Sequence, residues 1–115
     1  MPRKLKKLPA HFYQSATGNE PVRDWLQTLD DEDKKTIGED IATVEFAWPV
    51  GMPTCKSLGS GLWEVRTSLP SKREARIIFA VNEERMVLLH GFIKKAQKTP
   101  KSDLDLAKKR LKEIG

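Results

Sequence analysis

The sequence predicts an α+β fold made of an N-terminal strand, two helices, three strands and a C-terminal helix. In residues 62–93 apolar residues alternate or run continuously, as in strands, whereas on both sides they recur at helical spacing. Short polar loops separate the three strand-like segments, so consecutive strands are expected to be antiparallel neighbours in a meander. Helices that cover one side of this antiparallel sheet would complete the fold.

The N-terminal part of the chain predicts one strand and two helices. Residues 8–13 favour a first strand, which Pro9 interrupts, and residues 16–19 predict a turn in which Asn19 is a possible helix cap. A short helix follows, with apolar residues at helical spacing: Val22, Trp25, Leu26 and Leu29. The next helix has an apolar stripe of Ile37, Ile41, Val44 and Trp48. The acids at 30–33 are typical of its N-terminus, where they meet the positive end of the helix dipole, and this role is preferred over a metal site.

Turns delimit the remaining elements. Strands are predicted at residues 62–66, 75–81 and 86–93. The glycines of residues 59–61 predict a turn before the first of them. A C-terminal helix is expected to begin at Thr99 and Pro100, a helix cap followed by proline at the first helical position. Its core face would carry Leu104, Ala107, Leu111 and Ile114.

Length and composition restrict the class of protein. The 115 residues are the size of one domain, so a single domain over residues 1–115 is expected. No apolar run approaches the roughly 20 residues of a membrane span, and no apolar stretch after the basic N-terminus suggests a signal peptide. We therefore expect a soluble, cytoplasmic protein without a membrane partner. Cys55 is the one cysteine, and with two histidines it cannot complete a four-ligand zinc site, so neither metal nor cofactor is expected.

The charges are segregated along the chain. The net charge is +5, with four bases and no acid in residues 1–19, nine acids and three bases in residues 20–45, and fourteen bases and seven acids in residues 46–115. One interpretation is a positive surface that binds a polyphosphate such as nucleic acid. The other is a solvated surface with no partner.

Basic residues at the ends of the predicted strands are the main functional candidates, because no nucleophile-elbow, zinc-protease, P-loop or dinucleotide-binding motif is present. Consecutive strands of a meander run in opposite directions, which would bring four cations to one edge of the sheet: Arg66, Arg76, Lys94 and Lys95. Like charges that lie together cost stability, so the cluster is expected to need a compensating anion. The alternative is that each is a solvated charge at a strand end. His11 and His90 could form an acid–base pair, although a hydrogen-bonded structural role is preferred for His90.

A site of arginine and lysine without metal suits the cleavage of RNA. RNA carries its own nucleophile, the 2′-OH, so a protein needs only to align it, neutralise the transition state and protonate the leaving 5′ oxygen. Arginine matches a phosphate with two parallel hydrogen bonds, while lysine acts as a point charge and as a proton carrier.

Four segments resemble the phage-derived HigB-like toxins of the RelE/ParE superfamily. They are GLWEVR at residues 61–66, RIIF at 76–79, VLLHGFIKKAQKTP at 87–100 and AKKRL at 107–111. The resemblance covers the chain from about residue 11. It implies a compact RelE-like α+β domain with a curved antiparallel sheet. It also implies a toxin of a type II toxin–antitoxin system that cuts mRNA on the ribosome without metal and is silenced by a helix-turn-helix antitoxin.

The resemblance further implies roles for single residues. Arg76 would stabilise the transition-state phosphate, Arg66 would orient the scissile phosphate, and Lys94 or Lys95 would donate a proton to the leaving group. His90 is a second candidate for acid–base chemistry.

Other basic residues are expected to bind RNA outside the reacting atoms: Lys56, Lys98 and Lys101. Glu64 shares a strand face with Arg66 and could be a general base or an ion-pair partner of that arginine, with the ion pair preferred. Two alternatives to the nuclease stay open. The chain could be a non-catalytic nucleic-acid-binding module or a module that functions through its antitoxin complex.

Overall fold

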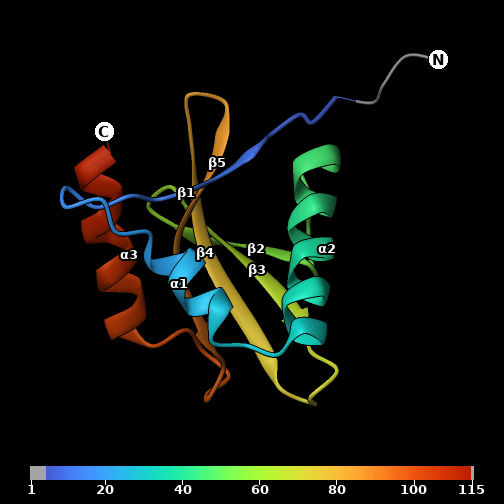
Figure 1. Ribbon diagram of the computed structural model, residues 1–115. Coiled ribbons are helices and arrows are strands. Elements are labelled where there is room, and N and C mark those ends of the chain that lie inside the picture. Colours follow the sequence, from blue (N-terminus) through green and yellow to red (C-terminus); the bar gives the residue numbers. More distant parts are fainter. Residues whose placement is uncertain (1–4, 115) are drawn as a thin grey trace.

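The computed structural model describes residues 5–114, which form three helices and one five-stranded mixed sheet (Figure 1). The elements follow one another as β1 (Ala10–Phe12), α1 (Pro21–Gln27), α2 (Asp31–Ala47), β2 (Cys55–Gly59), β3 (Leu62–Ser68), β4 (Glu74–Asn82), β5 (Arg85–Ile93) and α3 (Lys101–Ile114). The predicted α+β class is therefore confirmed, and the arrangement is consistent with a RelE-like fold. The basic residues Arg3 and Lys4 lie outside the described residues.

The predicted meander is present as β3, β4 and β5, which are antiparallel neighbours in the sheet order β1-β5-β4-β3-β2. Register within the meander places Arg66 of β3 directly opposite Arg76 of β4. Residues that face each other in this way point to the same side of a sheet. The register therefore brings the two arginines together on one face.

The prediction of a fully antiparallel sheet is wrong at its first strand. β1 pairs with β5 in parallel, and no hairpin constrains its direction because both N-terminal helices and the rest of the meander separate the two strands. β2, which was not predicted from the sequence, pairs with β3 and forms the other edge of the sheet. β2 is short and mostly exposed, so it lacks the alternating apolar pattern that marks a half-buried strand.

Helices lie on both faces of the sheet, which corrects the prediction of one covered side (Figure 1). On one face, α1 and α2 pack their apolar residues against Val65, Ile77, Phe79 and Leu88. On the other face, α3 packs Leu104, Ala107 and Leu111 against Leu62, Ile78, Ala80 and Leu89. The helical periodicity showed which residues of each helix are buried but not which face of the sheet each helix covers.

A β-bulge and a close contact shape β5. The register between β4 and β5 shifts at Ile78 and Phe79, so Leu89 has no direct partner and His90 faces the side of the sheet on which α3 lies. On the opposite face, a Cβ built on Gly91 would lie 2.5 Å from Cε3 of Trp25. The absence of a side chain at Gly91 therefore lets α1 approach the sheet. Glu20 rather than the predicted Asn19 occupies the N-cap position of α1, and its side chain makes no capping hydrogen bond.

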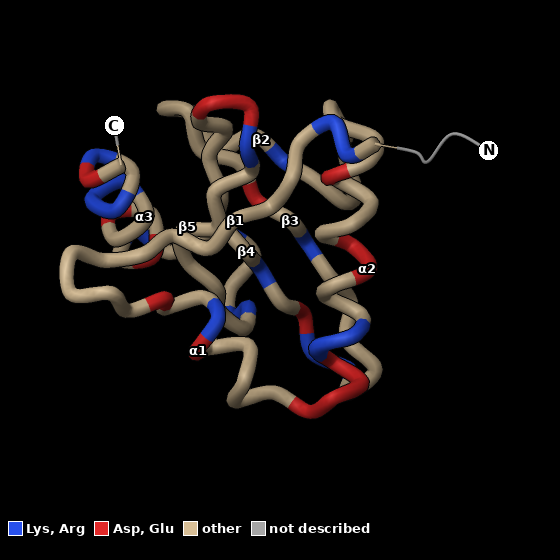
Figure 2. The backbone as a smooth tube through the Cα atoms, turned by 45° about the horizontal axis from the view of Figure 1, so that its top comes forward, with Lys and Arg blue, Asp and Glu red and all other residues tan. Residues whose placement is uncertain are grey.

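Ion pairs such as Lys6–Glu45 and Arg73–Asp33 join acidic and basic residues that are far apart in the sequence. The acidic run that opens α2 and the lysine-rich α3 lie on opposite sides of the molecule (Figure 2). Among the described residues, none of the helices combines the length and the apolarity needed to traverse a lipid bilayer.

Candidate functional site

The site is built around a buried carboxylate on β3. Glu64 is fully buried, and its Oε1 accepts hydrogen bonds from Arg66 Nε at 3.1 Å and from Arg76 Nη1 at 2.9 Å. Its Oε2 accepts a hydrogen bond from the Thr99 hydroxyl at 2.7 Å. The preferred interpretation of Glu64 as an ion-pair partner is confirmed, because both of its oxygens are engaged and neither faces solvent.

The two arginines differ in how much of each guanidinium is available. Arg76 is only 3% exposed; its Nη1 and Nη2 donate to Glu64 and to Glu74, the latter at 3.3 Å, and its buried Nε has no acceptor. The Arg66 side chain is 23% exposed and uses only Nε, so its two terminal nitrogens have no acceptor among residues 5–114. Arg66 is therefore the arginine that can present a two-pronged donor edge to a ligand.

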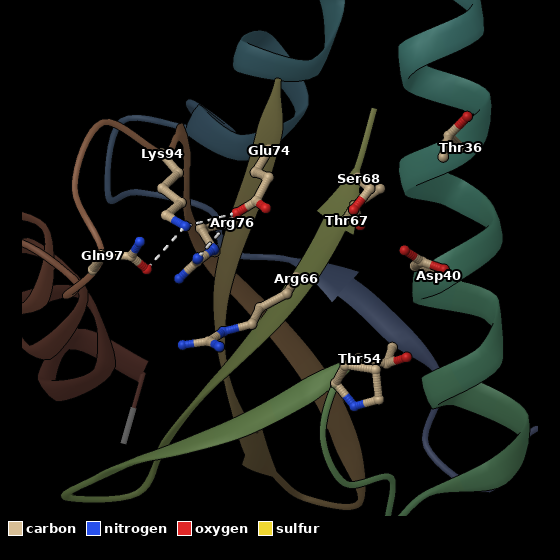
Figure 3. A pocket seen from close by; sticks show the side chains of 11 residues that line it. Thr36, Asp40, Thr54, Arg66, Thr67, Ser68, Glu74, Arg76, Lys94 and Gln97 are labelled. Carbon is tan, nitrogen blue, oxygen red and sulfur yellow. Dashed lines mark hydrogen bonds and ion pairs between the residues drawn. The ribbon is translucent and has the colours of Figure 1, made fainter. Parts of the chain in front are cut away.

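Lys94 follows β5 and completes the cluster. Its ammonium lies 3.0 Å from the Glu74 carboxylate and donates to the side-chain oxygen of Gln97 at 3.4 Å (Figure 3). The ammonium of Lys94 and the guanidinium of Arg76, both hydrogen-bonded to Glu74, hold the pKa of that carboxyl below its ordinary value. Glu74 is thus ionised at neutral pH and fixes Lys94 at the edge of the site.

These side chains line a cavity of about 470 Å³ at the end of β3, where residues from both faces of the sheet contribute and α2 borders one side. The lining residues come from α2, from the segment before β2, and from β3, β4 and the segment after β5: Thr36, Asp40, Pro53, Thr54, Arg66, Thr67, Ser68, Glu74, Arg76, Lys94 and Gln97. Figure 3 shows Asp40 on α2 and the Arg66 side chain extending from β3 away from α2, toward the side where Arg76 and Lys94 lie. Hence Arg66, Arg76 and Lys94 lie around one concave surface, as the strand topology predicted.

The cluster does not lack a counter-charge, which corrects one expectation from the sequence. The carboxylates of Glu64 and Glu74 lie against the cations, so the protein itself supplies the anions that offset their repulsion. What remains open to a ligand is the free edge of Arg66 rather than an uncompensated group of charges.

The other predicted site residues lie at varying distances from this cavity. Lys95 is exposed and lines an adjacent groove of about 570 Å³, which shares Glu74, Lys94 and Gln97 with the cavity. Lys98 is exposed outside both concave surfaces, and Lys101 pairs with Asp105 on α3 at 3.3 Å. Their roles in binding RNA stay predictions.

Lys56 and His90 occupy the same face of the sheet as the arginines but not the cavity. Lys56 on the edge strand β2 lies opposite Glu64 in the register and is exposed. His90 Nε2 lies 2.6 Å from Asp103 Oδ1, and its ring stacks on Phe92 with centroids 5.5 Å apart. This environment favours the structural role of His90, because its ring is already held by α3.

Sequence reasoning missed three residues of the site. Glu74 could have been found from strand parity, since it precedes Arg76 by two residues and faces the same side. Thr99, predicted as a helix cap, donates its hydroxyl to Glu64 instead, and Asp40 reaches the cavity from a helix. The last two depend on tertiary packing, for which the sequence carries no local signal.

The described residues offer no evident metal centre or reactive thiol. Within residues 5–114, no three histidine, cysteine, aspartate or glutamate side chains converge as a metal-ion cluster. Cys55 is buried, and this burial, with a smaller contribution from the Glu64 carboxylate, raises the pKa of its thiol to about 11. Such a thiol is protonated at neutral pH, so it is a poor nucleophile.

Together, the fold and the cavity define a small α+β protein with a site of arginine, lysine and carboxylate side chains. Comparison with family models gives a match to "Phage derived protein Gp49-like (DUF891)" over residues 24–112. The chain belongs to this Gp49-like family, which is a toxin-like family of the toxin–antitoxin type. Comparison with curated proteins gives no match.

Proposed function

We propose that the protein is the toxin of a type II toxin–antitoxin system, related to the HigB and RelE toxins, and that it cleaves mRNA on the ribosome. The proposal rests on the Gp49-like family and on the cavity that Arg66, Arg76 and Lys94 line. Its partners would be ribosome-bound mRNA and a cognate helix-turn-helix antitoxin, and it would act in the cytoplasm.

The observation that carries the proposal is the hydrogen bonding of the Arg66 guanidinium. Buried Glu64 holds its Nε, while its two terminal nitrogens stay free at the cavity. A guanidinium fixed in this way loses little conformational entropy when it binds a phosphate through two hydrogen bonds. Arg66 is therefore oriented in advance for the non-bridging oxygens of a phosphodiester.

The reaction proposed for this geometry is attack by the 2′-OH on the adjacent phosphorus. The 2′-OH loses its proton to water, the O2′–P bond forms and the P–O5′ bond breaks, which gives a 2′,3′-cyclic phosphate and, once O5′ is protonated, a 5′-OH. Arg66 binds the oxygens on which negative charge accumulates, and Arg76 behind it adds positive charge to the cavity wall. In this proposal Lys94, which pairs with Glu74 at the edge of the site, gives its proton to the leaving 5′ oxygen.

The test is controlled expression in a bacterium with mapping of mRNA 5′ ends. The wild type should arrest growth and produce new cuts confined to translated reading frames. Arg66→Gln should lower cleavage by roughly 100-fold or more, as the loss of one transition-state donor commonly does. It should leave the fold intact, because Arg76 and Thr99 still satisfy Glu64.

The matched control is Arg23→Gln, which changes an exposed arginine of α1 that does not line the cavity. It should arrest growth and cut mRNA as the wild type does. Arrest without cuts would replace the nuclease with a non-catalytic binding module. Absence of arrest would favour a module that functions only in its antitoxin complex, and full activity of Arg66→Gln would show that the site lies elsewhere.

A further inference from the structure

The α2 wall of the cavity differs in chemistry from the sheet wall. Arg66 and Arg76 enter the cavity from the sheet face that α3 covers, while α2, on the opposite face, contributes Asp40 to the same cavity (Figure 3). Asp40 is only partly exposed, and it has no hydrogen-bond or ion-pair partner within residues 5–114. The cavity thus contains a free acceptor that the proposed cleavage reaction does not use.

The other carboxylates at the site are paired with cations. Glu64 is buried with both oxygens engaged by Arg66, Arg76 and Thr99, and Glu74 is hydrogen-bonded to Lys94 and Arg76. Asp40 is therefore the one described carboxylate lining the cavity that has no cation partner and has both oxygens free to accept hydrogen bonds from a ligand.

The surroundings of Asp40 combine apolar surface with hydroxyl groups. The Thr36 hydroxyl donates to the Glu32 carbonyl of its own helix at 2.9 Å, so what this residue can offer a ligand is mainly its methyl group. Pro53 adds an apolar ring to the lining, and Thr54 and Ser68 add hydroxyl groups. A planar heterocycle with polar edges matches such a surface better than a phosphate does, because Asp40 would repel an anion.

We propose that the α2 wall is a nucleobase subsite that selects guanine through Asp40. This inference rests on the proposed function in one respect, namely that the ligand is RNA. The charges of the two walls orient the chain, with the phosphate against Arg66 and the base against Asp40. Single-stranded RNA is generally recognised in this way, by hydrogen bonds to the Watson–Crick edge of an unstacked base.

Guanine is the base that fits an unpaired carboxylate best. Its Watson–Crick edge presents two adjacent donors, N1–H and N2–H, which match the two oxygens of a carboxylate. Adenine and cytosine present one amino group beside an acceptor nitrogen, and uracil presents one N–H between two carbonyls. Each of these three places an acceptor against the Asp40 carboxylate, which is repulsive.

The test measures binding rather than cleavage, so it is independent of catalysis. Four fluorescein-labelled 2′-O-methyl pentanucleotides, UUNUU with N as G, A, C or U, lack the nucleophilic hydroxyl and cannot be cut by 2′-OH attack. Fluorescence anisotropy of the full chain should show roughly 10-fold or tighter binding of the G oligonucleotide than of the U oligonucleotide, since a good bidentate pair discriminates by about that factor or more. Asp40→Asn should reduce this preference to less than about 3-fold, mainly by weakening the binding of the G oligonucleotide, because its paired contact with the carboxylate is lost.

The control is Glu39→Gln, which removes an exposed carboxylate from the neighbouring position of α2. It should keep the guanine preference, and thermal melting should show that both variants fold. Equal binding of all four oligonucleotides, no binding of any, a guanine preference that survives in Asp40→Asn, or an equal gain in affinity for all four would each overturn the subsite. Failure of the nuclease would appear differently, as guanine-selective binding without cuts in cells.

Discussion

At the scale of single residues, Glu64 places a fully buried carboxylate against two arginines and a hydroxyl. We expect Glu64→Ala to lower the free energy of unfolding by about 3–5 kcal/mol, because it leaves Arg76 buried without its main partner. Urea denaturation followed by circular dichroism measures this change.

The control is an exposed ion pair on α3. Asp105→Ala removes the partner of Lys101, whose side chain is 90% exposed, and should change stability by less than about 1 kcal/mol. Equal costs for the two substitutions would contradict the assignment of Glu64 as the centre of a buried network.

The contacts of single residues were predictable from the sequence where strand geometry determines them. The opposite directions of consecutive strands predicted that Arg66 and Arg76 converge, and strand parity placed Glu64 beside Arg66. Neither rule predicts that Thr99 and Asp40 belong to the site. Their positions depend on how the segment before α3 and the helix α2 pack against the sheet. The same rules also say nothing of burial, which is what separates Arg66 from the less accessible Arg76.

At the scale of elements, α1 has seven residues, too few for a helix that is stable alone, so its packing against β5 must hold it. Gly91→Ala should therefore destabilise the protein by roughly 1–3 kcal/mol, because the new Cβ would overlap the ring of Trp25. Faster hydrogen exchange of the α1 amides should accompany the loss of stability.

A glycine in the middle of α2 provides the matched control. A Cβ on Gly38 would meet no atom within 4 Å, so Gly38→Ala should raise stability by about 0.5–1 kcal/mol through helix propensity alone. Destabilisation of similar size in both variants would rule out the contact with Trp25 as the cause.

The types of the elements were more predictable than their pairing. Periodicity located the three helices and the strands of the meander, since burial of one face imposes the pattern. The direction of β1, the existence of β2 and the distribution of helices over the two faces depend on contacts between distant segments. The bulge at Leu89 belongs to the same group, because nothing in the apolar run of β5 indicates where the register shifts.

At the scale of the whole molecule, stability should fall on the alkaline side of neutrality through buried groups that resist ionisation. In the folded protein, burial raises the pKa of the Cys55 thiol to about 11 from its ordinary value of 9.0. Between these values the unfolded chain has lost the proton and the folded one has kept it, so unfolding becomes easier as pH rises. Tyr13 has the same sign, because its hydrogen bond to Glu113 and its burial raise the pKa of the phenol above 10.0.

Urea denaturation under reducing conditions at pH 8 and at pH 10 separates these two groups. Over this interval the wild type should lose about 1 kcal/mol more stability than Cys55→Ala, because the alanine variant has no thiol to ionise in the unfolded state. The remaining alkaline loss in Cys55→Ala should steepen above pH 10, where Tyr13 ionises in the unfolded chain. Parallel curves for the two proteins would mean that the Cys55 thiol ionises as readily in the folded state as in the unfolded one.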